Sequence, residues 1–161
     1  WRGPLTRDSE GYPAEGAAAL QLAHDGIHLL VRVEEAGDCA ALRNWEYEGD
    51  RWEVFVGAAP AQPYFQVCLM PDATVRQHAV GEPPPAGWEA DIRITVTRSP
   101  DREGWHWELR FPLALLGPAA PDGIAFNILR GTPCPVGAFA WSPVFTRSFH
   151  TPGRMGRLTL T

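Results

Sequence analysis

The sequence predicts an all-β protein, an antiparallel two-sheet β-sandwich of the immunoglobulin or jelly-roll kind with at most one helical turn. Three observations predict this class: short runs that alternate apolar with polar residues, the β-branched and aromatic side chains in those runs, and the Gly- and Pro-rich turns between them. About eight such runs occur, as is typical of a sandwich. The 161 residues are enough for one domain with a substantial core, so we expect a single domain over residues 1–161.

The N-terminal part combines an irregular stretch with the clearest hairpin signal of the chain. Residues 1–16 are rich in Gly, Pro and charge, and we expect an irregular lead-in there. Two apolar runs, residues 17–22 and 27–34, flank the dipeptide Asp25-Gly26, which is typical of a tight primed turn. The sequence therefore predicts a β-hairpin directly after the lead-in.

The central hairpin, residues 50–70, is the stretch around which the chain is organised. Side chains alternate between the two faces of a strand, so each strand here has one apolar face and a second face of mixed character. Glu53 and Gln66 are the polar members of that second face. A carboxylate and an amide among apolar neighbours must be paired, solvated or used in binding. The residues expected in the core are Trp52, Val54, Val56, Phe65, Val67 and Leu69.

The second half of the chain continues with short strands and turns. Three consecutive prolines in residues 81–87 predict a surface loop, because proline cannot donate to a sheet ladder. Residues 112–116, followed by Gly117, are the one helical turn that we expect. The remaining strands are expected at residues 74–80, 92–97, 105–111, 124–130, 139–141 and 157–161.

Composition and net charge argue against several classes of binding partner and metal site. The net charge of −5 gives no support for nucleic acid or an anionic membrane as a partner, and no apolar run approaches the roughly 18 residues needed to span a bilayer. Cys39, Cys68 and Cys134 form neither a disulfide framework nor a zinc motif. The turns around Asp8 and Asp101 contain pairs of carboxylates that suit calcium, although neither has an EF-hand loop.

Motifs of enzyme chemistry are missing from the sequence. It contains no GxSxG nucleophile elbow, no Gly-rich phosphate loop and no HExxH. Glu53 and Glu108 both fall on predicted strands, but nothing in the sequence brings them face to face, as the two carboxylates of a glycosidase must be. We therefore expect a protein that is not an enzyme.

The stronger signal is a set of aromatic and planar polar side chains. A sugar offers an apolar C–H face and a ring of hydroxyls, so its sites combine flat rings with carboxylates, amides and guanidinium groups. Trp45 and Tyr47 lie in the loop 37–49, and Trp141 lies near the C-terminus. Alternatively, Trp141 closes one end of the sandwich and Arg130 pairs with an acid. The polar residues of the right kind are Glu53, Gln66, Asn127 and Arg130.

Several blocks of sequence carry a resemblance that extends over nearly the whole chain. They are GDRWEVF at 49–55, YFQ at 64–66, GWHWELRFP at 104–112, FNILR at 126–130, WSP at 141–143 and FHTPGRMG at 149–156. In this order and spacing they resemble a family 9 carbohydrate-binding module, and the last two blocks are the most specific. The resemblance implies an antiparallel β-sandwich that binds a mono-, oligo- or polysaccharide between two aromatic rings, often with structural calcium. We expect at most that calcium and no catalytic transition metal, because clusters of thiolate and imidazole ligands are missing from the sequence.

Residue by residue, the resemblance makes Trp141 one aromatic platform and Trp45 or Tyr47 the facing one. The loop before the central hairpin departs from the family pattern, so the choice between Trp45 and Tyr47 stays open. The resemblance also implies a role within or beside a parent glycoside hydrolase, at an extracellular or periplasmic location. The polar contacts it implies are Glu53, Gln66, Asn127 and Arg130, with Arg76 and His150 as further candidates.

Two other functions remain open. A haem-binding domain related to DOMON-type sandwiches would need Met70 or Met155 as an axial ligand together with His78 or His150. A structural or interaction domain without a small ligand would use the aromatic residues only as core.

Overall fold

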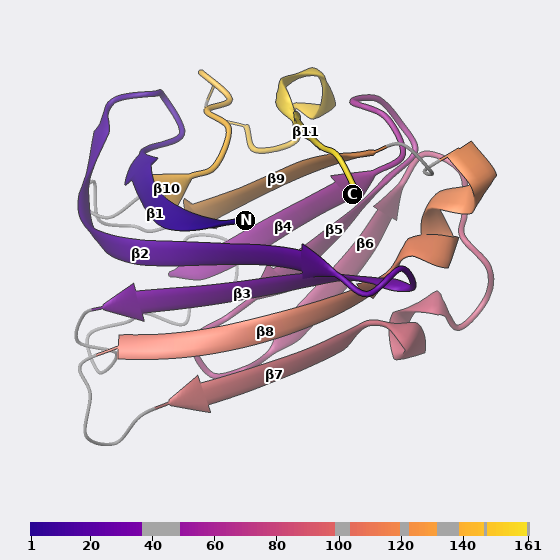
Figure 1. Ribbon diagram of the computed structural model, residues 1–161, viewed down its shortest axis with the longest axis horizontal. Coiled ribbons are helices and arrows are strands. Elements are labelled where there is room, and N and C mark those ends of the chain that lie inside the picture. Colours follow the sequence, from indigo (N-terminus) through magenta and orange to yellow (C-terminus); the bar gives the residue numbers. More distant parts are fainter. Residues whose placement is uncertain (37–48, 99–103, 120–122, 132–138, 147, 161) are drawn as a thin grey trace.

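The computed structural model in Figure 1 is built almost entirely of antiparallel strands that form two facing layers. The prediction of an all-β, sandwich-like fold is confirmed. Among the described residues, no helix is long and apolar enough to cross a membrane. The structure describes residues 1–36, 49–98, 104–119, 123–131, 139–146 and 148–160.

The described part of the chain contains eleven strands. They are β1 (Arg2–Arg7), β2 (Pro13–His24), β3 (His28–Ala36), β4 (Arg51–Gly57), β5 (Tyr64–Leu69), β6 (Val75–Val80), β7 (Arg93–Arg98), β8 (Gly104–Pro112), β9 (Ile124–Gly131), β10 (Phe139–Ala140) and β11 (Gly156–Leu158).

The two layers belong to one continuous, strongly curled sheet. Its strand order is β6-β5-β4-β9-β10-β1-β2-β3-β8-β7, with β11 paired to β9. The layer β6-β5-β4-β9 faces the layer β2-β3-β8-β7 (Figure 1), and the short strands β10 and β1 carry the hydrogen bonding from one layer to the other. The two layers are therefore not the two separate sheets expected from the sequence.

The prediction of an irregular lead-in over residues 1–16 is wrong. Strand β1 pairs with β2 from Arg2 to Arg7, although Pro4 lies in its middle. On its other side, among the described residues, β1 pairs with β10 at Arg7 alone, so most of that side behaves as a sheet edge, where a strand proline is tolerated. The Gly- and Pro-rich composition therefore marks an edge strand and a turn.

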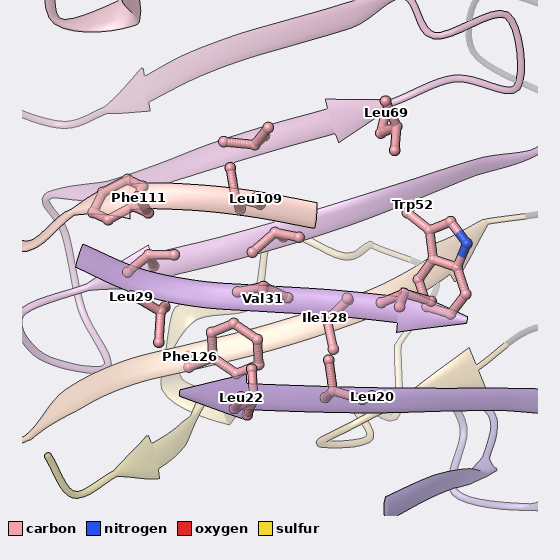
Figure 2. Packing of buried hydrophobic residues seen from close by; sticks show 14 of the residues in the cluster. Leu20, Leu22, Leu29, Val31, Trp52, Leu69, Leu109, Phe111, Phe126 and Ile128 are labelled. Atoms are coloured by element: carbon pink, nitrogen blue, oxygen red, sulfur yellow. The ribbon is translucent and has the colours of Figure 1, made fainter. Parts of the chain in front are cut away.

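The main core lies between the two layers, as Figure 2 shows. Leucines and valines from β2 and β3, such as Leu20 and Val31, face Trp52, Phe126 and Ile128 from β4 and β9. All five side chains are fully buried. Burying apolar area at about 25 cal/mol per Å² is the main stabilisation of such a core. The alternation predicted for the central hairpin is thus confirmed. The opposite face of β4 and β5 points away from this core.

Short 3-10 helices join some of the strands. The expected helical turn is the 3-10 helix η3 (Leu113–Ala119), and Gly117 breaks it with a left-handed φ of 69°. Two further turns, η2 (Trp88–Asp91) and η4 (Pro152–Arg154), were not expected. In η2 the buried Trp88 packs on Phe65 with ring centroids 5.0 Å apart, so this contact fixes the turn after the proline-rich loop.

Candidate functional site

A groove of about 590 Å³ lies on the outer face of β4, β5 and β6, on the side away from the main core. Its floor follows from strand register, because residues directly opposite one another on neighbouring strands share a face. The C-terminal segment 148–150 forms a wall. Two cross-strand rows run along this face, Glu53–Cys68–Arg76 and Phe55–Gln66–His78, and all of their residues except the buried Phe55 line the groove.

Glu53 and Gln66 form a buried polar pair in this floor. The exposed fraction is 4% for Glu53 and 5% for Gln66. The Gln66 amide Nε2 donates to Glu53 Oε2 at 2.7 Å, and Arg51 Nε donates to Oε1 of the same carboxylate. Burial of a charge requires such partners, and they hold the carboxylate in one orientation beside the groove. The expectation that Glu53 and Gln66 converge on one face is met.

The wall of the groove is fixed by contacts of Phe149 and His150. The His150 Nδ1 atom lies 2.9 Å from the Tyr64 hydroxyl, and the imidazole meets the Phe55 ring edge-on with centroids 5.6 Å apart. The Arg51 guanidinium lies over the Phe149 ring, 5.7 Å from its centroid. Burial raises the pKa of Tyr64, so its hydroxyl keeps its proton at neutral pH. These contacts link the C-terminal segment to the central hairpin.

Cys68 lies in the floor beside Glu53 and is a neutral thiol. Burial and the negative charge of Glu53 raise the pKa of Cys68 to about 12. A reactive cysteine needs a lowered pKa, so Cys68 is unsuited to be a nucleophile here. Its role in the groove is to fill space with a small apolar group.

Asn127 and Arg130, both predicted to contact a sugar, lie outside the lining of the groove. The Asn127 amide donates to the Ser142 carbonyl at 2.8 Å and accepts from the Ser142 and Ile128 amides at 3.0 and 2.9 Å. Asn127 therefore holds the turn after β10.

Arg130 belongs to a buried ion-pair cluster on the core side of β9. Its guanidinium contacts Asp50 at 2.7 Å and Glu35 at 3.0 Å. Burial alone would lower the pKa of Arg130, but the charges of Glu35 and Asp50 more than offset it and raise the pKa. Trp52 Nε1 also donates to Glu35, at 2.8 Å. The alternative interpretation, in which Arg130 pairs with an acid, therefore describes the structure.

Trp141 lies on the opposite side of the sheet from the groove. Its half-buried ring packs edge-to-face on Phe126, with centroids 5.3 Å apart, and belongs to the margin of the main core. The structure does not bring Trp141 together with Glu53 and Gln66. Trp45 and Tyr47, the other predicted platforms, fall outside the described residues.

The groove thus brings together four of the predicted residues and adds others. The predicted ones that line it are Glu53, Gln66, Arg76 and His150. Sequence reasoning missed Arg51 and Phe149, and it named His78 only as a haem ligand and not as a sugar contact. A signal existed for Arg51 and His78, because each lies two positions from a predicted residue on the same strand and therefore on the same face.

The positions of Glu108 and Asp8 bear on two other interpretations of the sequence, a pair of facing carboxylates as in a glycosidase and a calcium site. Glu108 lies exposed on the outer face of β8, in the other layer, and pairs with Arg32 at 3.4 Å, so it does not face Glu53. Asp8 Oδ1 accepts the backbone amides of Glu10 and Tyr12, both at 2.9 Å, as in an ordinary turn. Among the described residues, no three His, Cys, Asp or Glu side chains are placed to hold a metal ion. Structural calcium stays a prediction, and the turn around Asp101 lies outside the described residues.

The fold is shared with solved carbohydrate-binding proteins. A family 9 carbohydrate-binding module from Caldicellulosiruptor kristjanssonii matches with a TM-score of 0.73 in complex with cellotriose, at 14% identity over 99% of this chain and 82% of the module. Its complex with glucose matches with a TM-score of 0.72, at 13% identity over 99% of this chain and 84% of the module.

A third solved structure agrees with these two. A candidate carbohydrate-binding protein from Bacteroides uniformis matches with a TM-score of 0.70, at 16% identity over 100% of this chain and 86% of that protein. No protein-family model matches the sequence, and no curated protein sequence matches it either. On this structural likeness, the chain has the fold of the family 9 carbohydrate-binding modules.

Proposed function

We propose that this chain is a non-catalytic carbohydrate-binding module that holds a saccharide in the groove above β4, β5 and β6. The observation that carries the proposal is the Glu53–Gln66 pair, which is buried, oriented by hydrogen bonds and part of the groove lining. A sugar hydroxyl both donates and accepts hydrogen bonds, so it is matched by a carboxylate beside an amide.

The pair has hydrogen-bonding capacity beyond its internal contact. A carboxylate has about four lone-pair positions, and an amide has two donor hydrogens and one acceptor. Gln66 uses one hydrogen on Glu53, whose two oxygens each accept one bond from Gln66 or Arg51. The remaining capacity is already oriented before a ligand arrives, which lowers the entropic cost of binding.

The structural neighbours support the same class of ligand, because one of them is described with glucose and cellotriose bound. We further propose that the module works within or beside a glycoside hydrolase that acts on polysaccharides outside the cytoplasm. Binding to a substrate surface increases the local concentration of an attached enzyme.

Glycan screening followed by calorimetry tests the proposal. We expect the protein to bind at least one saccharide, and Glu53→Gln to weaken that binding at least tenfold by removing the charge at nearly constant shape. Glu108→Gln is the matched control, because Glu108 also lies mid-strand but on the outer face of the other layer. No binding to any saccharide, or an unchanged affinity of Glu53→Gln with an unchanged melting temperature, contradicts the proposal.

Haem binding is the second candidate, because Met70, His78 and His150 line the same groove. A Met–His pair can ligate haem iron. The buried charge of Glu53 in the floor favours a polar ligand over the apolar face of a porphyrin. Titration of the purified protein with haem decides between the two: a stoichiometric Soret band that His78→Ala or His150→Ala removes would support haem.

A further inference from the structure

We infer that His150 carries its imidazole proton on Nε2 and donates it to a hydroxyl of the saccharide, and that Tyr64, behind the ring, is the positioning residue that fixes this donor. The inference rests on the proposed function and adds a specificity-determining contact to the same groove. Its basis is one hydrogen bond, in which His150 Nδ1 lies 2.9 Å from the Tyr64 hydroxyl. His150 is exposed and lines the groove, whereas Tyr64 is only 2% exposed and lies behind that lining.

The Tyr64 hydroxyl is the donor in this hydrogen bond. A phenol has one hydrogen to donate, and within the described part of the chain the hydrogen-bond partner of this hydroxyl is His150 Nδ1 alone. If Nδ1 carried the proton, it would donate to the hydroxyl oxygen and leave the phenol hydrogen of a buried residue without an acceptor, which destabilises the fold. Burial also raises the pKa of Tyr64, so the hydroxyl is protonated and able to donate at neutral pH.

The direction of this bond selects one tautomer and one orientation of the His150 ring. A ring nitrogen that accepts a hydrogen bond carries no proton, so the neutral imidazole has its N–H at Nε2. The ring also meets Phe55 edge-on, with the two planes at 86° and the centroids 5.6 Å apart. An imidazole turned over in its own plane would keep the contact with Phe55, but it would present a carbon to the Tyr64 hydroxyl and lose the hydrogen bond.

The fixed donor of His150 lies beside the Glu53–Gln66 pair. Tyr64 and Gln66 are two residues apart on the same face of β5, a separation of about 7 Å along the strand, and Gln66 donates to Glu53 at 2.7 Å. The groove therefore presents an acceptor, the Glu53 carboxylate, and a donor, His150 Nε2. A sugar hydroxyl that meets Glu53 must donate, and one that meets His150 must accept. The spacing of these two groups thus favours sugars whose hydroxyls match both.

The tautomer can be measured on the protein without sugar. Long-range proton–nitrogen correlation spectra distinguish the two neutral tautomers, because protonated and unprotonated imidazole nitrogens resonate far apart. We expect His150 to show a protonated Nε2 and an unprotonated Nδ1 in the wild type, and a mixture of tautomers in Tyr64→Phe. His78 lines the same groove and is the internal control, whose spectrum should be the same in both proteins.

Calorimetric titration with glucose, galactose, mannose and xylose, well below the melting temperature of each variant, tests the contact with the sugar. We expect at least one of these sugars to bind, and Tyr64→Phe to weaken that binding about fivefold. Tyr12→Phe is the matched control, because Tyr12 is 65% exposed and outside the groove lining.

Two replacements of His150 ask which ring nitrogen matters. The amide of Gln reaches the position of Nε2 and the shorter amide of Asn that of Nδ1, so His150→Gln should keep more affinity than His150→Asn. Adding Tyr64→Phe to His150→Gln should change the affinity little, because Tyr64 acts through the imidazole.

The outcomes separate this inference from the proposed function. A proton on Nδ1 of His150 in the wild type, an unchanged affinity of Tyr64→Phe, or equal losses in His150→Gln and His150→Asn overturns the inference and leaves the proposed function standing. Failure of all these monosaccharides to bind, while a longer glycan binds, also overturns the inference alone. Failure of every glycan in the screen overturns both.

Discussion

The indole ring of Trp141 lies directly against the backbone of Gly156. A methyl group in place of a glycine hydrogen would stand 2.3 Å from Cζ3 of that ring, closer than any real contact. The glycine therefore makes room for the tryptophan, which also packs edge-to-face on Phe126. This contact joins the segment after β10 to β11 and places Trp141 in the structure as a packing residue.

Replacing Trp141 should accordingly affect stability more than binding. We expect Trp141→Ala to lower the free energy of unfolding by about 2 kcal/mol, below the 3–5 kcal/mol of a fully buried tryptophan because the ring is half-buried. Gly156→Ala should cost about 1–3 kcal/mol by overpacking, and less in the Trp141→Ala background. Urea unfolding of the two single variants and the double variant measures this coupling. Loss of sugar binding at unchanged stability in Trp141→Ala would restore its role as a platform.

Much of the fold could be predicted from local pattern. The period of two in the central hairpin assigned Trp52 and Val54 to the core and Glu53 and Gln66 to the other face, and the structure agrees. The β1 strand could not be found this way, because it is stabilised by pairing along β2 and not by an apolar pattern of its own. The link between the two layers was equally hidden, since it depends on the two-residue strand β10.

The candidate site was predictable only in part, for a similar reason. Residue type made Asn127, Arg130 and Glu53 equal candidates for sugar contacts. Which of them meets solvent depends on partners distant in sequence: Ser142 for Asn127, and Glu35 for Arg130. Those pairings arise from strand order and the turn after β10, which no local pattern encodes. Asn127 and Arg130 are held by these internal contacts, whereas Glu53 lies on the face where the groove is open and lines it.

The buried cluster around Arg130 provides a second test of stability. Arg130→Ala leaves the buried carboxylate of Asp50 and the mostly buried carboxylate of Glu35 without their guanidinium, and breaking a buried pair in this way typically costs about 3–5 kcal/mol. Arg110→Ala is the control, because its ion pair with Asp25 at 3.1 Å is largely exposed and should contribute less than about 1 kcal/mol. Chemical denaturation at pH 7 compares the two. Equal losses for both variants would show that the Arg130 cluster is no more important than a surface pair.

The stability at alkaline pH should report on Cys68. Its folded-state pKa of about 12 is above the ordinary value of 9.0, because burial and Glu53 disfavour the thiolate. The folded protein therefore keeps a proton that the unfolded chain releases, and this contribution is fully present below pH 9 and is lost as pH rises toward 12. We expect wild type to lose about 1 kcal/mol per pH unit more than Cys68→Ala between pH 9 and 11. Parallel pH profiles of the two proteins would contradict the burial of this thiol.

The aromatic platform is the remaining part of the sugar site, and we expect it from Trp45 or Tyr47. Trp45 and Tyr47 lie outside the described residues. Gly49, which follows them in the chain, accepts a hydrogen bond at 3.3 Å from Arg51, a residue that lines the groove. A flat ring that stacks on a sugar removes apolar area from water. Losing that ring should cost about 2 kcal/mol, or roughly thirtyfold in affinity.

Three alanine variants test this expectation by calorimetry and thermal melting. Trp45→Ala or Tyr47→Ala should lose most of the affinity for the saccharide found by screening, with an unchanged melting temperature. Tyr12→Ala is the matched control, because Tyr12 is 65% exposed and lies in the turn between β1 and β2, away from the groove lining. If neither Trp45→Ala nor Tyr47→Ala changes the affinity more than Tyr12→Ala does, the sugar is held without a ring from this loop. Phe149 would then be the ring to replace next, since its side chain lines the groove and is braced by Arg51.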